Sequence, residues 1–203
     1  MVEILHIDCM EYMKGLADNA FDIAIVDPQY GIEADKKNAH SSIRDNDKWA
    51  LKEWDKQPPG ADYFLELFRV SKHQIIWGGN YFLDYLPSTQ CFLIWNKPER
   101  NFSLADAEIA WTSFKKSIRV YDSPRNKGQR IHPTQKPIGL YKWMYQKFVQ
   151  EGWKVLDTHL GSGSSAIVAE KLGFDFVGCE IDKDYYKAAL NRFNKETDLG
   201  LFK

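Results

Sequence analysis

The chain has 203 residues, with 27 Lys and Arg against 28 Asp and Glu, and 44% of the residues are hydrophobic. This length and composition predict one globular domain over residues 1–203 and exclude wholesale disorder. The near-neutral charge counts against nucleic acid as the partner, because phosphate binding prefers a basic surface, but it says nothing about a local basic patch.

No apolar run approaches the roughly 20 residues that a membrane helix needs, so no membrane partner is expected. The first residues are partly acidic and lack a basic leader, which is not typical of a signal peptide. Cys9, Cys91 and Cys179 are isolated thiols without CxxC spacing. This pattern favours a reduced, cytoplasmic protein over a disulfide framework or a zinc site, and we expect no metal.

Short apolar runs alternate with helical patterns along most of the chain. Strands are predicted at Glu3–His6, Asp22–Val26, Gln74–Trp77, Phe92–Trp95, Glu108–Trp111, Ile118–Tyr121, Lys154–Leu156 and Phe176–Cys179. Helices are predicted at Asp62–Val70, Pro137–Gln150, Ser164–Leu172 and Lys183–Lys195. This alternation predicts an α/β fold with a doubly wound, mainly parallel sheet covered by helices on both faces. The three strands between Phe92 and Tyr121 lack intervening helices and should form an antiparallel edge.

The first two polar motifs each follow an apolar strand. Asp8, next to Cys9, is a typical helix N-cap. Further on, Asp27 ends a strand and is followed by Pro28, Gln29, Tyr30 and Gly31. Ligands of open α/β sheets bind beyond the carboxyl ends of the strands, where Asp27 would lie. Asp-Pro before Gly is also a common turn signal, so both interpretations stay open.

Residues 31–57 have six acidic and six basic side chains and no hydrophobic period. Loops of this length in compact domains are usually functional or disordered. We predict a mobile lid loop here, with a solvated insertion as the alternative.

Two later motifs could bind a ligand. The segment from His132 to Pro137 carries Lys136 and leads into a helix, an arrangement that favours a carboxylate ligand, although a proline-framed loop is the alternative. The strand ending at Asp157 leads into the loop Gly161-Ser162-Gly163 and a helix start at Ser164. Glycines allow close approach of a ligand, and the helix offers unpaired N–H groups.

Glu180 ends the next strand, about 20 residues on, where an acidic side chain can accept both ribose hydroxyls. Together with the glycine loop this favours a nucleoside-containing cofactor over a structural turn. The glycine spacing is not GxGxxG, which disfavours nicotinamide and hence an oxidoreductase.

These motifs occur in one order: Asp8-Cys9, Asp27-Pro-Gln-Tyr30, His132–Pro137, and Asp157–Ser164 with Glu180. This order resembles the β-class, S-adenosylmethionine-dependent amino-methyltransferases of DNA, particularly small bacterial and phage adenine methylases. Residues 75–81, 95–97 and 108–111 also resemble the middle of such enzymes. Two departures stand out, because Gln29 replaces the second proline of Asp-Pro-Pro-Tyr, and Thr158-His159 replaces Pro-Phe in the cofactor motif.

The resemblance implies a methyltransferase (Rossmann-like) sheet, circularly permuted, with strand 154–156 at its centre. Strands 176–179 and 3–6 would follow on one side and strand 22–26 on the other, with the chain termini meeting on one face. The implied reaction is transfer of a methyl group from S-adenosylmethionine to the exocyclic amine of adenine in DNA, after the base is flipped out.

The resemblance also assigns residues to roles. The implied catalytic residues are Asp27, Pro28 and Tyr30. The implied cofactor-binding residues are Asp8, Cys9, Asp27, Thr134, Lys136, Asp157, Gly161, Ser162, Gly163, Ser164 and Glu180. Among these, Thr134 and Lys136 would bind the methionine carboxylate.

A short target-recognition segment is expected at residues 96–131. The stretch Tyr121–Lys136 has four basic residues and one acidic residue, or 4 − 1 = +3. The DNA-binding candidates are Lys97, Arg100, Asn101, Arg125, Lys127 and Arg130. Expected partners are double-stranded DNA, a second copy of the chain and a cognate restriction endonuclease.

Three alternatives stay open from the sequence. The same fold can methylate the exocyclic amine of cytosine, or an amine in RNA or protein. The Asp-first tetrapeptide favours adenine, because cytosine enzymes of this class more often begin it with Ser. A catalytically silent DNA-binding subunit is the third alternative, against which the intact Asp27, Tyr30 and Glu180 argue.

Overall fold

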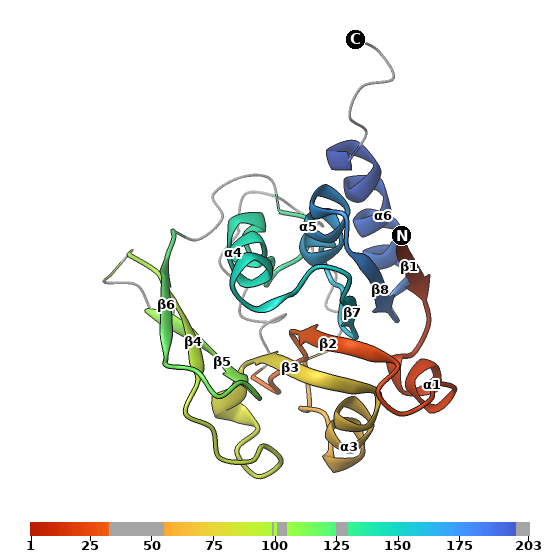
Figure 1. Ribbon diagram of the computed structural model, residues 1–203. Helices are drawn as coiled ribbons and strands as arrows, with labels where there is room; N and C mark the ends of the chain where they lie inside the picture. Colours follow the sequence, from red (N-terminus) through yellow and green to blue (C-terminus); the bar gives the residue numbers. More distant parts are fainter. Residues whose placement is uncertain (33–54, 99, 101–104, 125–129, 198–203) are drawn as a thin grey trace.

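The computed structural model describes residues 1–32, 55–98, 100, 105–124 and 130–197 (Figure 1). The strands are β1 (Val2–His6), β2 (Phe21–Val26), β3 (Ser71–Trp77), β4 (Phe92–Asn96), β5 (Ala107–Thr112), β6 (Arg119–Asp122), β7 (Lys154–Asp157) and β8 (Asp175–Glu180). The helices are α1 (Cys9–Lys14), α3 (Ala61–Val70), the short 3-10 helix η1 (Gly79–Tyr81), α4 (Ile138–Phe148), α5 (Ser164–Leu172) and α6 (Lys183–Thr197). Every predicted strand is present, with ends that differ by a few residues at most.

The sheet has eight strands in the order β1-β8-β7-β2-β3-β5-β4-β6. The five strands from β1 to β3 pair in parallel. Strand β7 lies between β8 and β2, with β1 beyond β8, and this confirms the predicted strand neighbours. Strand β2 is almost wholly buried, as its apolar run Ile23–Val26 requires in a sheet covered on both faces. The circular permutation stays a prediction.

The prediction of a wholly antiparallel edge was wrong for its last strand. Strand β5 pairs antiparallel with both β3 and β4, but β6 pairs in parallel with β4. The chain reverses direction between β4 and β5 and again before β6. Because β6 then lies on the outer side of β4 rather than beside β5, the two strands run the same way.

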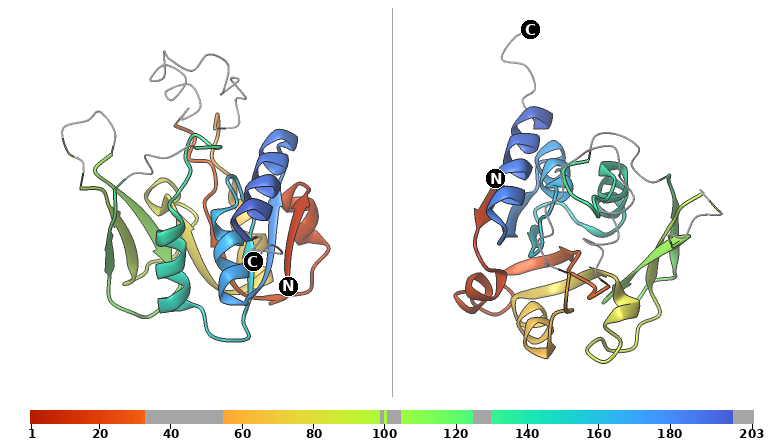
Figure 2. Two further views of the ribbon diagram at one scale, coloured as in Figure 1. Left: turned by 90° about the horizontal axis from the view of Figure 1, so that it is seen from above. Right: turned by 180° about the vertical axis from the view of Figure 1, so that it is seen from behind.

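Helices cover both faces of the sheet, as Figure 1 shows. Helices α4, α5 and α6 pack on one face, where the buried cluster includes Leu140, Met144 and Ala166. Helices α1 and α3 pack on the other, where the buried cluster includes Met13, Phe64 and Leu67. The views of Figure 2 place α6 beside β1 at the N-terminus; residues 198–203 lie outside the described part. Among the described helices, none is long and apolar enough to cross a membrane.

Local signals explain the helix boundaries. Asp8 is the N-cap of α1, and its Oδ1 accepts from Met10 N at 2.7 Å, as the cap interpretation predicted. Helix α4 begins at Ile138, with Pro137 as its N-cap instead of its first residue. Gly173 ends α5 in the left-handed region (φ 75°), which is typical of a glycine at a helix C-terminus.

The sheet has a switch point between β7 and β2. From β2 the chain proceeds through α3 to β3 on one side, and from β7 it proceeds through α5 to β8 on the other. Loops that diverge in this way leave a crevice at the carboxyl ends of the two strands, which is where ligands of open α/β sheets bind.

Candidate active site

A cavity of about 960 Å³ lies at the switch point. The end of β2 contributes Asp27, Pro28 and Tyr30 to its wall, and the loop after β7 and the end of β8 contribute Gly161 and Glu180. The two strongest sequence motifs therefore face one cavity, although they are more than a hundred residues apart in the chain.

Most of the predicted site residues line this cavity. They are Asp8, Cys9, Asp27, Pro28, Tyr30, Lys97, Arg130, Thr134, Lys136, Gly161, Ser162 and Glu180. Asp157, Gly163, Ser164 and Arg100 lie outside its lining. Asn101, Arg125, Lys127 and residues 33–54 of the predicted lid lie outside the described residues, as does part of the predicted 96–131 segment.

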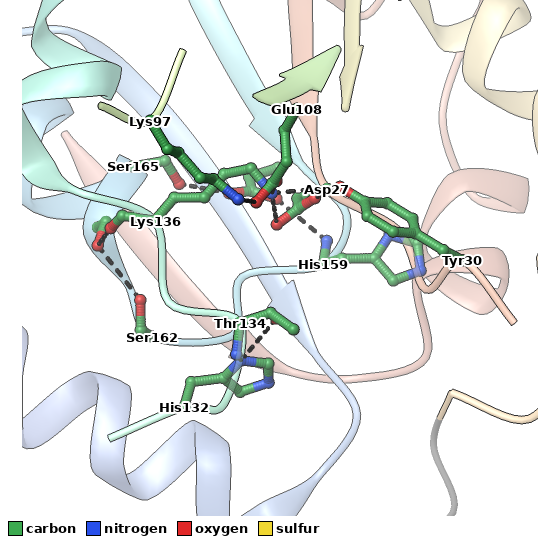
Figure 3. Close-up of polar contacts among 12 residues, drawn as sticks. Asp27, Tyr30, Lys97, Glu108, His132, Thr134, Lys136, His159, Ser162 and Ser165 are labelled. Atoms are coloured by element: carbon green, nitrogen blue, oxygen red, sulfur yellow. Dashed lines mark hydrogen bonds and ion pairs between the residues drawn. The ribbon is translucent and has the colours of Figure 1, made fainter. Parts of the chain in front are cut away.

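Asp27 is held by two neighbours, drawn in Figure 3. Its Oδ1 accepts from the Tyr30 hydroxyl at 2.5 Å, and its Oδ2 lies 2.5 Å from Nζ of Lys136. Lys136 also lies 3.1 Å from Oε2 of Glu108, and it donates to Tyr30 Oη at 3.2 Å. The orientation of the Asp27 carboxylate is thus fixed from its own loop and from the segment before α4.

Glu108 joins a second lysine to this group. Its Oε1 is ion-paired with Nζ of Lys97, which also lies 4.5 Å from the centre of the Trp95 ring. The side chain of Lys97 is only 7% exposed, so it lies within the wall of the cavity and not on an open surface. Two carboxylates and two ammonium groups therefore form a neutral cluster, which we call the Asp27 cluster: Asp27, Glu108, Lys97 and Lys136.

The pKa values in this cluster follow from burial and from the alternation of charge. Burial raises the pKa of Asp27 and Glu108 adds to the rise, while Lys136 and Tyr30 oppose it. For Glu108 burial also disfavours the charge, but Lys136 and Lys97 outweigh it and the pKa falls below its usual value. Burial would lower the pKa of Lys136, but the two carboxylates outweigh it and raise it.

Tyr30 is positioned by close packing at a glycine. Its ring is stacked on Tyr81, with ring centres 5.0 Å apart, and it meets the edge of Phe82. Gly78 has φ of 71°, and a Cβ there would lie 2.2 Å from Cε1 of Tyr30. Only glycine therefore fits at position 78 without moving the tyrosine.

The glycine loop and the end of β8 hold each other. Oε2 of Glu180 accepts from Gly161 N at 2.8 Å, and its Oε1 accepts from Asp182 N at 2.9 Å. Burial raises the pKa of Glu180, while the backbone amides partly offset this effect. Gly161 and Gly163 both have positive φ, at 53° and 74°, a backbone conformation that glycine adopts without strain.

Asp157 acts behind the loop. It is 1% exposed, accepts from His159 N at 3.1 Å, and also accepts from the Ser165 hydroxyl. Burial raises its pKa to about 7. Its contacts connect the end of β7 with the start of α5, so in this structure Asp157 shapes the glycine loop.

Thr158 and His159, the two departures from the family motif, form a polar relay with Tyr63. The Thr158 hydroxyl lies 2.7 Å from Tyr63 Oη and 2.9 Å from Nδ1 of His159. Burial lowers the pKa of His159 to about 4, so the ring is neutral at pH 7. The imidazole takes the place of the family's phenylalanine in the cavity wall and brings a polar edge to it.

The segment before α4 bridges the two halves of the site. Ser164 donates its hydroxyl to the backbone oxygen of Lys136 at 2.9 Å, and Arg192 donates to Ser164 Oγ at 2.9 Å. Thr134 is positioned by His132, with 3.1 Å between Oγ1 and Nδ1. Lys136 thus contacts the glycine-loop side through its backbone and Asp27 through its side chain.

The remaining predicted residues have these surroundings. Burial raises the pKa of the Cys9 thiol to about 12, so the thiol stays protonated. Arg130 donates to Pro133 O at 3.4 Å. Arg100, 44% exposed, donates to Asn96 Oδ1 at 2.6 Å.

Sequence reasoning gave no role to Glu108, Tyr63 or Gly78. A signal for Glu108 was available, since it is the one charged residue in the strand Ala107–Thr112 and precedes the apolar run Ile109–Trp111. A buried carboxylate of this kind needs a partner. The strand register that sets Trp95 opposite Glu108 could not be read from the sequence. Within the described residues, no group of His, Cys, Asp or Glu is arranged to hold a metal ion.

Comparisons with known proteins place this geometry in a family. The DNA methylase model (N6_N4_Mtase) matches residues 21–191. A type II methyltransferase, M2.LlaDCHI from Lactococcus lactis subsp. cremoris, is 39% identical over 70 residues. That match covers 34% of this chain and 26% of the relative, so it spans about a quarter of the relative's length.

Two solved structures share the fold. The M1.HpyAVI–SAM complex has a TM-score of 0.62 at 23% identity and covers 98% of this chain and 100% of its own. The cytosine-N4-specific PvuII DNA methyltransferase has a TM-score of 0.66 at 13% identity and covers 97% of this chain and 90% of its own. At these identities the likeness shows the fold alone. The family model, which matches most of the chain, shows that this chain belongs to the N6/N4 DNA methylase family.

Proposed function

We propose that this DNA methylase transfers a methyl group from S-adenosylmethionine to the exocyclic amine of adenine in double-stranded DNA. The observation that carries the proposal is the position of Asp27. Its carboxylate lines the cavity beside Tyr30, and the same cavity is lined by the glycine loop and Glu180.

The residues present fit S-adenosylmethionine. Each carboxylate oxygen of Glu180 accepts one hydrogen bond from a backbone N–H. Because a carboxylate has about four acceptor sites, two remain for the ribose hydroxyls. Gly161, with its positive φ, leaves space that a side chain would take: a Cβ there would lie 3.7 Å from the His132 ring. When bound, S-adenosylmethionine supplies an electrophilic methyl group.

The chain's part in the reaction is to prepare and position the amine. The lone pair of an adenine amine is delocalised into the ring, which makes the nitrogen a poor nucleophile. We assign one amine hydrogen to Asp27 and the other to the Pro28 carbonyl, whose backbone the proline ring makes rigid. Each Asp27 oxygen already accepts one hydrogen bond, and free lone pairs remain for the amine.

Flipping of the base follows from the position of the carboxylate. The Asp27 side chain is only 16% exposed, so a base stacked in a duplex could not reach it. Extrusion costs a few kcal/mol, and stacking on an aromatic ring returns about 1–3 kcal/mol. We propose Tyr30 as that ring, with Tyr81 stacked against one of its faces and the base on the other.

For the duplex we propose contacts from Arg100 and Arg130. Arg100 follows β4 and is partly exposed. Arg130 lines the cavity and lies just before the segment His132–Pro137, which carries Lys136. Asn101, Arg125 and Lys127 stay predictions from the sequence, as do a second copy of the chain and a restriction endonuclease as partners.

Product analysis tests the proposal. The chain is incubated with methyl-labelled S-adenosylmethionine and unmethylated DNA, and the digested nucleosides are identified by mass spectrometry. Label in N6-methyl-2′-deoxyadenosine supports the proposal, and label in N4-methyl-2′-deoxycytidine would show that the proposed target base is wrong. Label in RNA or protein but in no DNA would overturn the proposed substrate.

A further inference from the structure

We propose that Lys136 and Glu108 are positioning residues for Asp27, with Lys136 as the counter-ion of the catalytic carboxylate and Glu108 as the residue that holds Lys136. This inference rests on the proposed function for its consequence in catalysis. It gives Lys136 a role different from binding of the cofactor carboxylate.

The ammonium of Lys136 has no N–H group to spare. It has three donors, and it has three acceptors within reach, on Asp27 at 2.5 Å, Glu108 at 3.1 Å and Tyr30 at 3.2 Å. Its side chain is 2% exposed. An ammonium with all its donors satisfied inside the protein is a poor partner for a second ligand.

Lys136 faces two carboxylates and not one. With Asp27 alone, a buried lysine would place its full charge against one carboxylate and weaken it as an acceptor for an amine. Glu108 takes part of that interaction from the opposite side, and Lys97 in turn neutralises Glu108. Because the charges alternate, Lys136 divides its attraction between two carboxylates and does not saturate Asp27.

The backbone of Lys136 and the carboxylate that holds its side chain are both anchored. The Lys136 backbone is anchored to Ser164 at 2.9 Å, and Glu108 is anchored within β5 opposite Trp95. Lys136 is therefore fixed at both ends, and the carboxylate that it contacts is fixed relative to the glycine loop. A positioned reacting group can be worth about 100-fold in rate.

Other titratable groups also face Asp27. Tyr30 donates to it from the same loop, while Tyr141 on α4 and Asp157 on β7 lie close enough for its charge to influence their pKa values. These groups are present in every variant below, so their contributions to the pKa of Asp27 cancel when the variants are compared.

The experiment measures the pKa of Asp27 directly, in the chain without ligand, by carboxyl ¹³C NMR. The signal is assigned by its loss in Asp27→Asn. Lys136→Met removes a positive charge and should raise the pKa of Asp27. Glu108→Gln removes a negative charge and should lower it. Shifts in opposite directions from two neighbouring substitutions are not expected from a general loosening of the site.

The double variant Lys136→Met with Glu108→Gln tests whether the two effects on the pKa of Asp27 offset each other. Because it removes one charge of each sign, the pKa of Asp27 should return toward the wild-type value. In single-turnover methyl transfer at pH 7, Lys136→Met should lose about 100-fold, and the double variant should recover part of that loss. It also remains informative if Lys136→Met alone fails to fold.

Lys171→Met is the matched control, because Lys171 forms an exposed ion pair with Glu196 at 3.8 Å, away from the site. It should leave the pKa of Asp27 unchanged. Unchanged values in both single variants, or shifts of the same sign, would overturn the proposal. A cofactor affinity that falls about 100-fold in Lys136→Met with no change at Asp27 would restore the cofactor role. The NMR result does not depend on the substrate, so failure of the proposed function would appear only in product analysis.

Discussion

Gly161 donates its backbone N–H to Oε2 of Glu180 at 2.8 Å, across 19 residues of sequence. The glycine loop after β7 and the acidic end of β8 therefore support each other before any ligand binds. A preorganised pair of this kind reduces the ordering that binding would otherwise require.

Glu180→Ala should weaken binding of S-adenosylmethionine by about 1.5–3 kcal/mol, because charge-assisted hydrogen bonds to the ribose are lost. Glu180→Gln, which keeps one acceptor oxygen, should lose less. Isothermal titration of both variants checks this order. Unchanged affinity in Glu180→Ala would remove Glu180 from the cofactor site.

Gly78→Ala should abolish most methyl transfer while cofactor affinity changes little. The new Cβ would lie 2.2 Å from the Tyr30 ring, so the tyrosine must move away from Asp27. Gly152→Ala is the matched control, because Gly152 also has positive φ, at 79°, but nothing lies within 4 Å of its Cβ position.

The control separates backbone strain from displacement of Tyr30. Both variants should lose some stability in thermal unfolding, and only Gly78→Ala should lose activity. Equal turnover in the two variants would contradict the positioning role that we give to Gly78.

Asp157 and His159 should give opposite pH dependences of stability. The pKa of His159 falls from 6.5 to about 4 on folding, so between these values the unfolded chain binds the extra proton and stability rises with pH. The pKa of Asp157 rises from 3.8 to about 7, so in nearly the same window the folded chain holds the extra proton and stability falls with pH.

Each site changes the slope by up to about 1.4 kcal/mol per pH unit, so the two contributions nearly cancel in the wild type. Denaturant unfolding between pH 4 and pH 7 checks this, with each variant compared to wild type. Relative to wild type, the free energy of unfolding of His159→Phe should fall more steeply as the pH rises. That of Asp157→Asn should rise more steeply. Parallel curves for all three proteins would contradict the assigned pKa values.

Much of the fold could be predicted from the sequence, because apolar runs and their turn signals mark each strand. The neighbours of β7 were also predicted correctly, but from the family resemblance and not from the pattern of the strands themselves. The pairing of β6 with β4 was not, since strand order at an edge depends on how a short connection crosses the sheet. Helix α1 was anticipated only through its cap, because it has six residues and little room for a period.

The site shows a similar division. Residues next to glycines and at strand ends, such as Asp27 and Glu180, could be found from local pattern. The surroundings of Lys136 and Lys97 could not, because both depend on Glu108, which the register of β4 and β5 brings to the cavity. A lysine in a sequence motif carries no sign of which carboxylate it will meet in the fold.

The most direct measurement is the single-turnover rate of methyl transfer by Asp27→Asn, together with its affinity for S-adenosylmethionine. This substitution keeps the shape of the side chain and removes the charge that we propose accepts the amine hydrogen. The rate should fall by about 100-fold or more, as when an enzyme loses one preorganised electrostatic contact, and cofactor affinity should change far less. Full turnover by Asp27→Asn would contradict the role of the carboxylate on which this mechanism depends.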